Sequence, residues 1–180
     1  MSTAIYRKSA DGLTAGVDDG KRGVVEPNHL SAPRNGQVYA QYATVETMTE
    51  LENGMYVKYN PTTGVLDTKG AVTGPWYMVF NEEKLYDERK QSHRDYSMKA
   101  EDFTDKKLYP RLFAVQPGDI YTTNTLADGE YKVGDKLHPG TDGLLTTGGE
   151  GAGFAEVIKE YTLPDGITPA VKIRIIADAE

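Results

Sequence analysis

The sequence offers few residues whose types and spacing could support catalysis. His93, Arg94 and Asp95 match the start of a kinase catalytic loop, but Ala100 stands where that loop carries its asparagine. The glycine-rich loop, the strand lysine and the Asp-Phe-Gly triplet of kinases are also absent from the chain. Residues 146–154, TTGGEGAGF, lack the Gly-Lys-Ser/Thr ending of a phosphate-binding loop. We interpret that stretch as a mobile turn.

Metal-binding patterns are equally sparse. The three histidines are His29, His93 and His138. They are scattered, and none shows the i, i+4 spacing of a helical zinc pair. Asp18 with Asp19, or Asp128 with Asp135, could contribute carboxylates to a calcium site, but no twelve-residue ligand loop surrounds them. Because the chain has no cysteine, thiolate zinc sites, disulfides and cysteine nucleophiles are excluded. We predict a protein without cofactor or metal, and not an enzyme.

The charge balance limits the classes of partner. The 180 residues include 20 Lys and Arg against 27 Asp and Glu, a formal net charge of −7, so nucleic acid is not expected as the main partner. No apolar run approaches the length of a membrane span, and the N-terminal residues MSTAIYRKSADG lack the apolar core of a signal peptide. We expect a soluble protein made in a cytoplasm, with no membrane partner.

Short strands separated by turns are the elements that would position functional residues. Residues 38–44 alternate over a β-branched and aromatic run, which predicts a first strand. Within NGMYVKYNPTTGVLDTKG, residues 53–70, MYVKY and VLDT are expected to form two strands joined by an NPTTG turn. WYMVF, residues 76–80, would be a third strand, and the alternating AVKIRIIA, residues 170–177, the last.

A second stretch, DGEYKVGDKLHPGTDGLLTTGG at residues 128–149, resembles residues 53–70. With four extra residues placed in its turn, the alignment pairs Gly54 with Gly129, Tyr56 with Tyr131, Gly64 with Gly143, Leu66 with Leu145, and Met78 and Val79 with Val157 and Ile158. Glycine, tyrosine and leucine recur, and no polar residue of catalytic type does. We therefore predict a mainly β fold, a compact barrel or sandwich built from two similar three-strand units, about residues 50–83 and 125–160, within a domain spanning residues 38–180.

Residues 1–37 are expected to form an extended N-terminal arm. Closely spaced glycines and prolines make this segment too flexible for a helix and too broken for a core strand. It is either a disordered tail or an arm that becomes ordered only against a partner. Five singly spaced apolar residues could be its anchors: Leu13, Val17, Val24, Val25 and Leu30.

A charged excursion, about residues 84–112, separates the two units. Acidic and basic residues are dense in it and nearly balance, while its aromatic residues fit neither a helical stripe nor a strand. It is either a solvated loop or short helix, or a segment that docks on a neighbouring subunit. In the second case Tyr86, Arg89, Arg94 and Tyr96 are the candidate contacts, because Tyr and Arg are enriched at interface hot spots.

The order of glycine turns and short strands resembles the small β-rich decoration, or cement, proteins of tailed-phage heads, including the lambda-type head decoration protein. The resemblance covers roughly residues 50–83 and 118–176, and VGDKLHPGTDGLLTTGGEGAGFAEVIKEY is its most similar part. It implies a structural virion protein that binds the major capsid protein on the outer surface of the expanded capsid, often as a trimer, and clamps neighbouring capsomers. In that family an N-terminal arm commonly orders on the capsid. The doubled unit and the charged excursion depart from its smallest members.

Two other functions are consistent with the sequence. A carbohydrate-binding or receptor-contacting module of a phage fibre or tail would use Trp76 and exposed tyrosines to stack on sugar rings, although the apolar run around Trp76 favours core packing. A cell-wall hydrolase would need a carboxylate pair such as Glu82 with Glu101 or Asp102, and nothing in the sequence fixes the geometry of such a pair.

Overall fold

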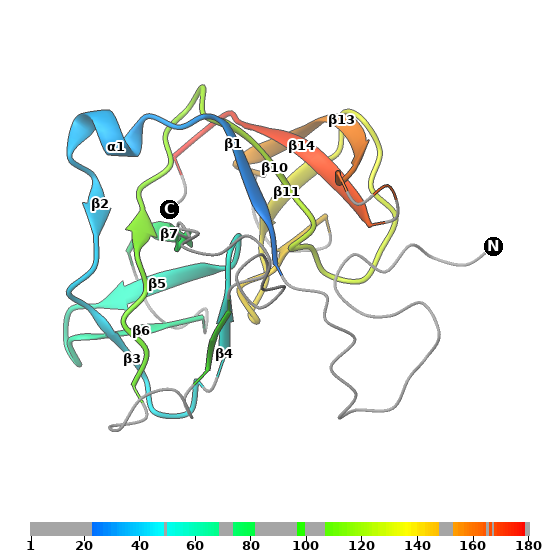
Figure 1. Ribbon diagram of the computed structural model, residues 1–180. Helices are drawn as coiled ribbons and strands as arrows, with labels where there is room; N and C mark the ends of the chain where they lie inside the picture. The colour runs from blue at the N-terminus through cyan, green and yellow to red at the C-terminus, as the bar shows by residue number, and fades with distance from the viewer. Residues whose placement is uncertain are drawn as a thin grey trace, which may run out of the picture.

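The computed structural model describes residues 23–48, 50–68, 74–81, 97–99, 107–147, 153–164, 166 and 168–178. Within these ranges the protein is mainly β, and its helix α1 (Ala32–Asn35) is four residues long (Figure 1). The described strands form two six-stranded sheets and a two-stranded ribbon of β4 (Glu50–Glu52) and β8 (Ser97–Lys99). The two large sheets pack together as a sandwich and neither closes into a barrel, so the predicted fold class is confirmed.

Sheet I contains the first unit and is strongly curled. Across the sheet its strands are β2 (Val38–Tyr39), β9 (Leu112–Phe113), β7 (Trp76–Val79), β5 (Tyr56–Asn60), β6 (Val65–Asp67) and β3 (Ala43–Thr44). The segment from Tyr39 to Ala43 can reach at most about 15 Å. In a flat six-stranded sheet the edge strands β2 and β3 would lie about 24 Å apart. The sheet must therefore bend until its two edges approach each other.

The curl also corrects one prediction. Residues 38–44 do not form a single strand, because the chain leaves one edge of sheet I after β2 and joins the other edge at β3. There β3 pairs with β6 in parallel, with Ala43 opposite Val65, while the other neighbouring strands of sheet I are antiparallel.

Sheet II contains the second unit. Across the sheet its strands are β1 (Val25–His29), β10 (Ile120–Thr123), β14 (Pro169–Ile175), β13 (Ala155–Thr162), β11 (Lys136–Pro139) and β12 (Leu145–Thr146). The predicted last strand is confirmed as β14, which pairs with both β10 and β13. Pro27 is tolerated in β1 because this strand lies at the edge of the sheet, where a missing N–H breaks no inner ladder.

The same three-strand unit occurs in both sheets, as predicted. The order is β6-β5-β7 in sheet I and β12-β11-β13 in sheet II, so the first strand of each unit lies in the middle. A glycine turn precedes each middle strand: the Gly54 N–H donates to Val79 O and the Gly134 N–H donates to Val157 O, both at 2.8 Å. Gly54 and Gly134 have φ values of 88° and 97°, which other residues adopt only with strain. The two units therefore share their backbone geometry.

The register of the repeat differs from the predicted one. The cross-strand pair Tyr56–Met78 of the first unit corresponds to Lys136–Glu156 of the second, and Val79 corresponds to Val157 rather than Ile158. Tyr131, the predicted counterpart of Tyr56, precedes β11, and its hydroxyl donates to Ala127 O at 2.7 Å. The sequence alignment followed matching residue types at the turn, whereas hydrogen bonding defines the structural equivalence.

The turn glycines of the two hairpins agree with the prediction, but the turn lengths do not, because the alignment placed four extra residues in the second turn. The Gly64 N–H donates to Asn60 O at 2.8 Å, and the Gly143 N–H donates to Gly140 O at 3.0 Å. Gly64 and Gly143 both have positive φ values, 72° and 80°, so their predicted equivalence is confirmed. Residues 61–63 lie between the bonded pair in the first unit and residues 141–142 in the second, so the second turn is the shorter one.

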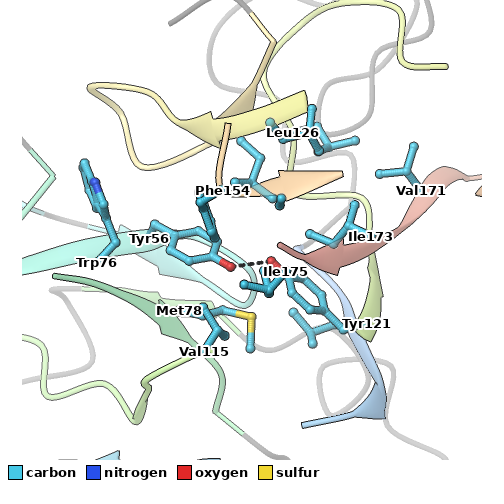
Figure 2. Packing of buried hydrophobic residues seen from close by; sticks show 14 of the residues in the cluster. Tyr56, Trp76, Met78, Val115, Tyr121, Leu126, Phe154, Val171, Ile173 and Ile175 are labelled. Atoms are coloured by element: carbon cyan, nitrogen blue, oxygen red, sulfur yellow. Dashed lines mark hydrogen bonds between the residues drawn. The ribbon is translucent and has the colours of Figure 1, made fainter. Parts of the chain in front are cut away.

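An inner core fills the space between the two sheets (Figure 2). The Tyr56 and Tyr121 hydroxyls, from β5 and β10, form a 2.6 Å hydrogen bond at its centre, and both side chains are fully buried. Phe154 packs edge-on against the Tyr56 ring at 5.3 Å between centroids. Burial raises the pKa of both tyrosines, so they remain neutral donors and acceptors. This pair contributes a polar contact of about 1 kcal/mol net between the sheets.

An outer core lies on the opposite face of sheet I. Its buried members are Leu51, Met55, Val57, Leu66, Val79, Leu108, Leu112 and Leu144. Strand alternation explains the separation of the cores, because Val57 and Val79 point away from their neighbours Tyr56 and Met78, which belong to the inner core. Sheet I is therefore buried on both faces at its centre, around Tyr56–Val57 and Met78–Val79.

The described end of the expected arm belongs to the β body. Val25 is 7% exposed in the inner core, and Leu30 packs against that core. The buried Asp119 carboxylate accepts hydrogen bonds from the Ser31 N–H at 2.8 Å and the Ser31 hydroxyl at 3.1 Å. The boundary expected at residue 37 is thus corrected: residues 23–37 are part of the sandwich, and the rest of the expected arm, residues 1–22, lies outside the described residues.

Candidate functional site

Most of the predicted contact residues lie outside the described residues. These are Leu13, Val17, Tyr86, Arg89, Arg94 and Tyr96. Of the others, Val24 is partly buried and its N–H donates to the Asn124 side chain at 2.7 Å. With Val25 and Leu30 in or against the inner core, this part of the chain is held by its own fold. The described residues of the excursion include β8, which pairs with β4, and the fully buried Leu108 and Leu112.

The candidate metal and catalytic residues do not converge within the described ranges. His29 is exposed at the end of β1, while His138 lies on β11 and contacts Pro139 O through Nδ1 at 3.0 Å. Asp135 accepts a hydrogen bond from the Lys132 N–H at 2.8 Å, which fixes its turn. Among the described residues, no group of three or more His, Cys, Asp and Glu side chains could hold a metal ion. His93, Asp18, Asp19, Glu82, Glu101 and Asp102 lie outside those residues.

Four tyrosines form a cluster that the sequence did not single out. Tyr39 lies on β2, Tyr77 on β7 and Tyr59 on β5, while Tyr42 lies between β2 and β3. All four are partly exposed and pack against the outer core. The curl of sheet I brings them together, because β2 and β3 are at opposite edges of its strand order. We call this group the tyrosine cluster.

Ring contacts hold the tyrosine cluster together. The centroid distances are 4.3 Å between Tyr42 and Tyr59, 5.7 Å between Tyr39 and Tyr77, and 6.3 Å between Tyr39 and Tyr42. Burial raises the pKa of Tyr77, and the neighbouring Tyr39 and Tyr42 raise it further. The cluster is an aromatic surface that carries hydroxyl groups. Its mutual contacts limit the side-chain entropy that would be lost on binding a partner.

The aromatic residue that the sequence did single out behaves as core. Trp76 is 9% exposed and belongs to the inner core, which confirms the preference for core packing. The Lys58 ammonium lies 4.8 Å from the centroid of its ring. Strand alternation around Trp76 and Tyr77 could have indicated that Tyr77 faces the other way. No local signal shows that Tyr42 and Tyr59 would meet, because they are far apart in the sequence.

Comparison with known proteins identifies no relative. No family model matches the chain, and neither the curated proteins nor the solved structures include a significantly similar one. Within the described part of the chain, no helix has the length and apolar character needed to cross a membrane. The functional argument therefore depends on the residues themselves.

Proposed function

We propose that this protein is a structural component of a tailed-phage virion that binds the outer surface of the expanded capsid. Its partner would be the major capsid protein, and each bound copy, in a trimer or other homo-oligomer, would stabilise contacts between neighbouring capsomers. The tyrosine cluster is the observation that carries this proposal. The pattern of glycine turns and short strands, which resembles that of head decoration proteins, supports the class of protein.

The chemistry of the tyrosine cluster suits a protein interface. Tyrosine is among the residue types that dominate interface hot spots, because one ring buries a large area and its hydroxyl can still find a partner. The four rings also present no charge that would have to be desolvated. A decoration protein needs only moderate affinity for each site. Every copy that binds the expanded lattice, and not the unexpanded one, adds to the stability of the expanded lattice.

Replacing Tyr42 and Tyr59 by alanine tests the cluster as the capsid contact. The purified variant would be mixed with expanded heads and with unexpanded procapsids of the parent phage, and bound protein measured after gradient sedimentation. We expect the wild-type protein to bind expanded heads only, and the double variant to bind them roughly tenfold to a hundredfold more weakly. Tyr109→Ala is the matched control, because Tyr109 is 43% exposed and lies outside the cluster.

Both test residues pack against the outer core, so stability must be measured in parallel. Tyr42→Phe with Tyr59→Phe keeps the rings in place and removes only the hydroxyls, which separates a folding defect from a lost contact. Unchanged occupancy in a folded alanine variant would exclude the tyrosine cluster as the capsid contact. Equal binding to procapsids and expanded heads, or to neither, would contradict the proposed function itself.

A further inference from the structure

A cavity of about 610 Å³ opens beside the tyrosine cluster, where two strands of sheet I separate. The ladder between β7 and β9 comprises only the pairs Met78–Phe113 and Val79–Leu112. Beyond these pairs the chain after β9 stays alongside the β2 segment, where the Ala114 N–H donates to Gln37 O at 3.2 Å. Trp76 and Tyr77, at the start of β7, therefore have no partner in β9. The cavity lies between them and the segment that follows β9.

The cavity is lined by aromatic rings, by carboxamides and by one carboxylate. Tyr39, Trp76 and Tyr77 supply the rings. Gln37 and Gln116 supply carboxamides, and the Gln116 amide nitrogen donates to Gln37 Oε1 at 2.9 Å. Asn35 extends this chain by donating to Gln116 Oε1 at 3.2 Å. These hydrogen bonds fix the two carboxamides in the cavity wall. Each carboxamide has further donor or acceptor capacity that a ligand could use.

The charge of the lining narrows the class of ligand. Among the described residues that line the cavity, Asp178 carries the only formal charge, so an anionic ligand would meet repulsion and no cation. A carboxylate and two carboxamides can accept from and donate to paired hydroxyl groups, while aromatic rings pack against C–H faces. A neutral sugar ring presents both kinds of surface. The volume also lies within the range of small-molecule sites, roughly 300 to 1,000 Å³.

We propose that this cavity binds a neutral mono- or disaccharide, with the rings of Tyr39 and Tyr77 against the sugar and Gln37, Gln116 and Asp178 bonded to its hydroxyls. This activity goes beyond capsid decoration, and its surface overlaps the tyrosine cluster at Tyr39 and Tyr77. Tyr42 and Tyr59, which test the capsid contact, do not line the cavity.

The test is a titration of the full-length chain with glucose, galactose, N-acetylglucosamine and maltose. Trp76 is the single tryptophan of the sequence and lines the cavity, so its fluorescence reports occupancy, with calorimetry as a second readout. We expect at least one neutral sugar to bind with a millimolar or lower dissociation constant. Gln37→Ala and Asp178→Asn should each weaken that binding at least tenfold, about 1.4 kcal/mol.

Gln41→Ala is the matched control, because Gln41 is an exposed glutamine of the same segment that does not line the cavity. It should bind sugar as the wild-type protein does. Three results would overturn the proposal: no neutral sugar binding up to about 10 mM, equal binding in the cavity variants and the control, or a preference for glucuronate, N-acetylneuraminate or choline over every neutral sugar. Urea unfolding of each variant shows that the comparison is made between folded proteins.

Discussion

The middle strand of the first unit, β5, is buried on both faces, whereas its counterpart β11 is buried on one. Tyr56 and Val57 are both fully buried, the first in the inner core and the second in the outer core. Their equivalents in β11 are Lys136, which is exposed, and Leu137, which is buried in the inner core. The same three-strand backbone arrangement thus lies between two cores in the first unit and between a core and solvent in the second.

The neighbouring strands show the same difference. Met78 of the first unit lies in the inner core, but its equivalent Glu156 lies on the outer face of sheet II. There Glu156 forms salt bridges to Lys136 at 3.3 Å and to Arg174 at 3.1 Å. The apolar pattern has moved by one position between the units, which in a strand moves it to the other face. The two units therefore share their backbone hydrogen bonding, while the residue type at each equivalent position depends on whether that position is buried or exposed.

Exchanging equivalent residues between the units should give the largest effect. Met78→Glu places a carboxylate at a fully buried position and should destabilise the fold by about 4 kcal/mol or more. The reciprocal Glu156→Met removes only surface ion pairs, so its urea midpoint should stay close to the wild-type value. Equal losses in the two variants would contradict the difference in layers.

Alanine at the two equivalent turn glycines should give a smaller, graded effect. At Gly54 a Cβ atom would come within 2.7 Å of the Thr123 hydroxyl and 2.8 Å of the Thr125 hydroxyl, while at Gly134 it would meet nothing within 4 Å. Because both φ values are positive, Gly134→Ala should cost about 1 kcal/mol of backbone strain. Gly54→Ala adds overpacking and should cost roughly 2 to 5 kcal/mol. Urea unfolding of both variants checks that Gly54→Ala is the more destabilising. Equal destabilisation, or a larger effect of Gly134→Ala, would contradict the close packing around Gly54.

The smallest expected effect is a change in acid sensitivity on the outer face of sheet II. Hydrogen bonds from Arg174 and Lys136 lower the pKa of the Glu156 carboxyl. A carboxyl whose pKa is lower in the folded than in the unfolded state stabilises the fold at pH values above its unfolded-state pKa, about 4.3. That stabilisation is lost as the pH falls from there through the folded-state pKa. Glu156→Gln removes this contribution, so its thermal midpoint should decline slightly less between neutral and acid pH. Lys132→Gln is the control, because Lys132 is exposed and forms no ion pair with Glu156.

Local patterns predicted the strands of the two units and β14, because strand alternation and turn glycines are properties of short segments. They did not predict β1, β4, β8, β9 or β10. The alternation of residues 170–177 identified β14, and the NPTTG turn identified the β5–β6 hairpin. The register between the units was not predictable, because the turn glycine of the second unit is Gly134, whereas sequence similarity favoured Gly129. The break between β2 and β3 was also missed, since it depends on the curl of the whole sheet.

The candidate site was the least predictable part. Tyr42 and Tyr59 have ring centroids 4.3 Å apart, and Gln37 and Gln116 share a 2.9 Å hydrogen bond, yet neither pair is close in the sequence. Such contacts exist only once strands from distant segments have joined one sheet. The predicted contacts outside the described residues, such as Tyr86 and Arg89, remain predictions.

By itself, the sequence determined that this chain makes two glycine-punctuated β units without a cysteine or a dense cationic surface. Those properties follow from residue type, side-chain period and the positive φ that glycine allows. Only the tertiary structure decided that the first unit lies between two apolar layers, whereas the second packs on the inner core with one face and faces solvent with the other. Burial depends on what packs against a face, and that partner comes from a distant part of the chain.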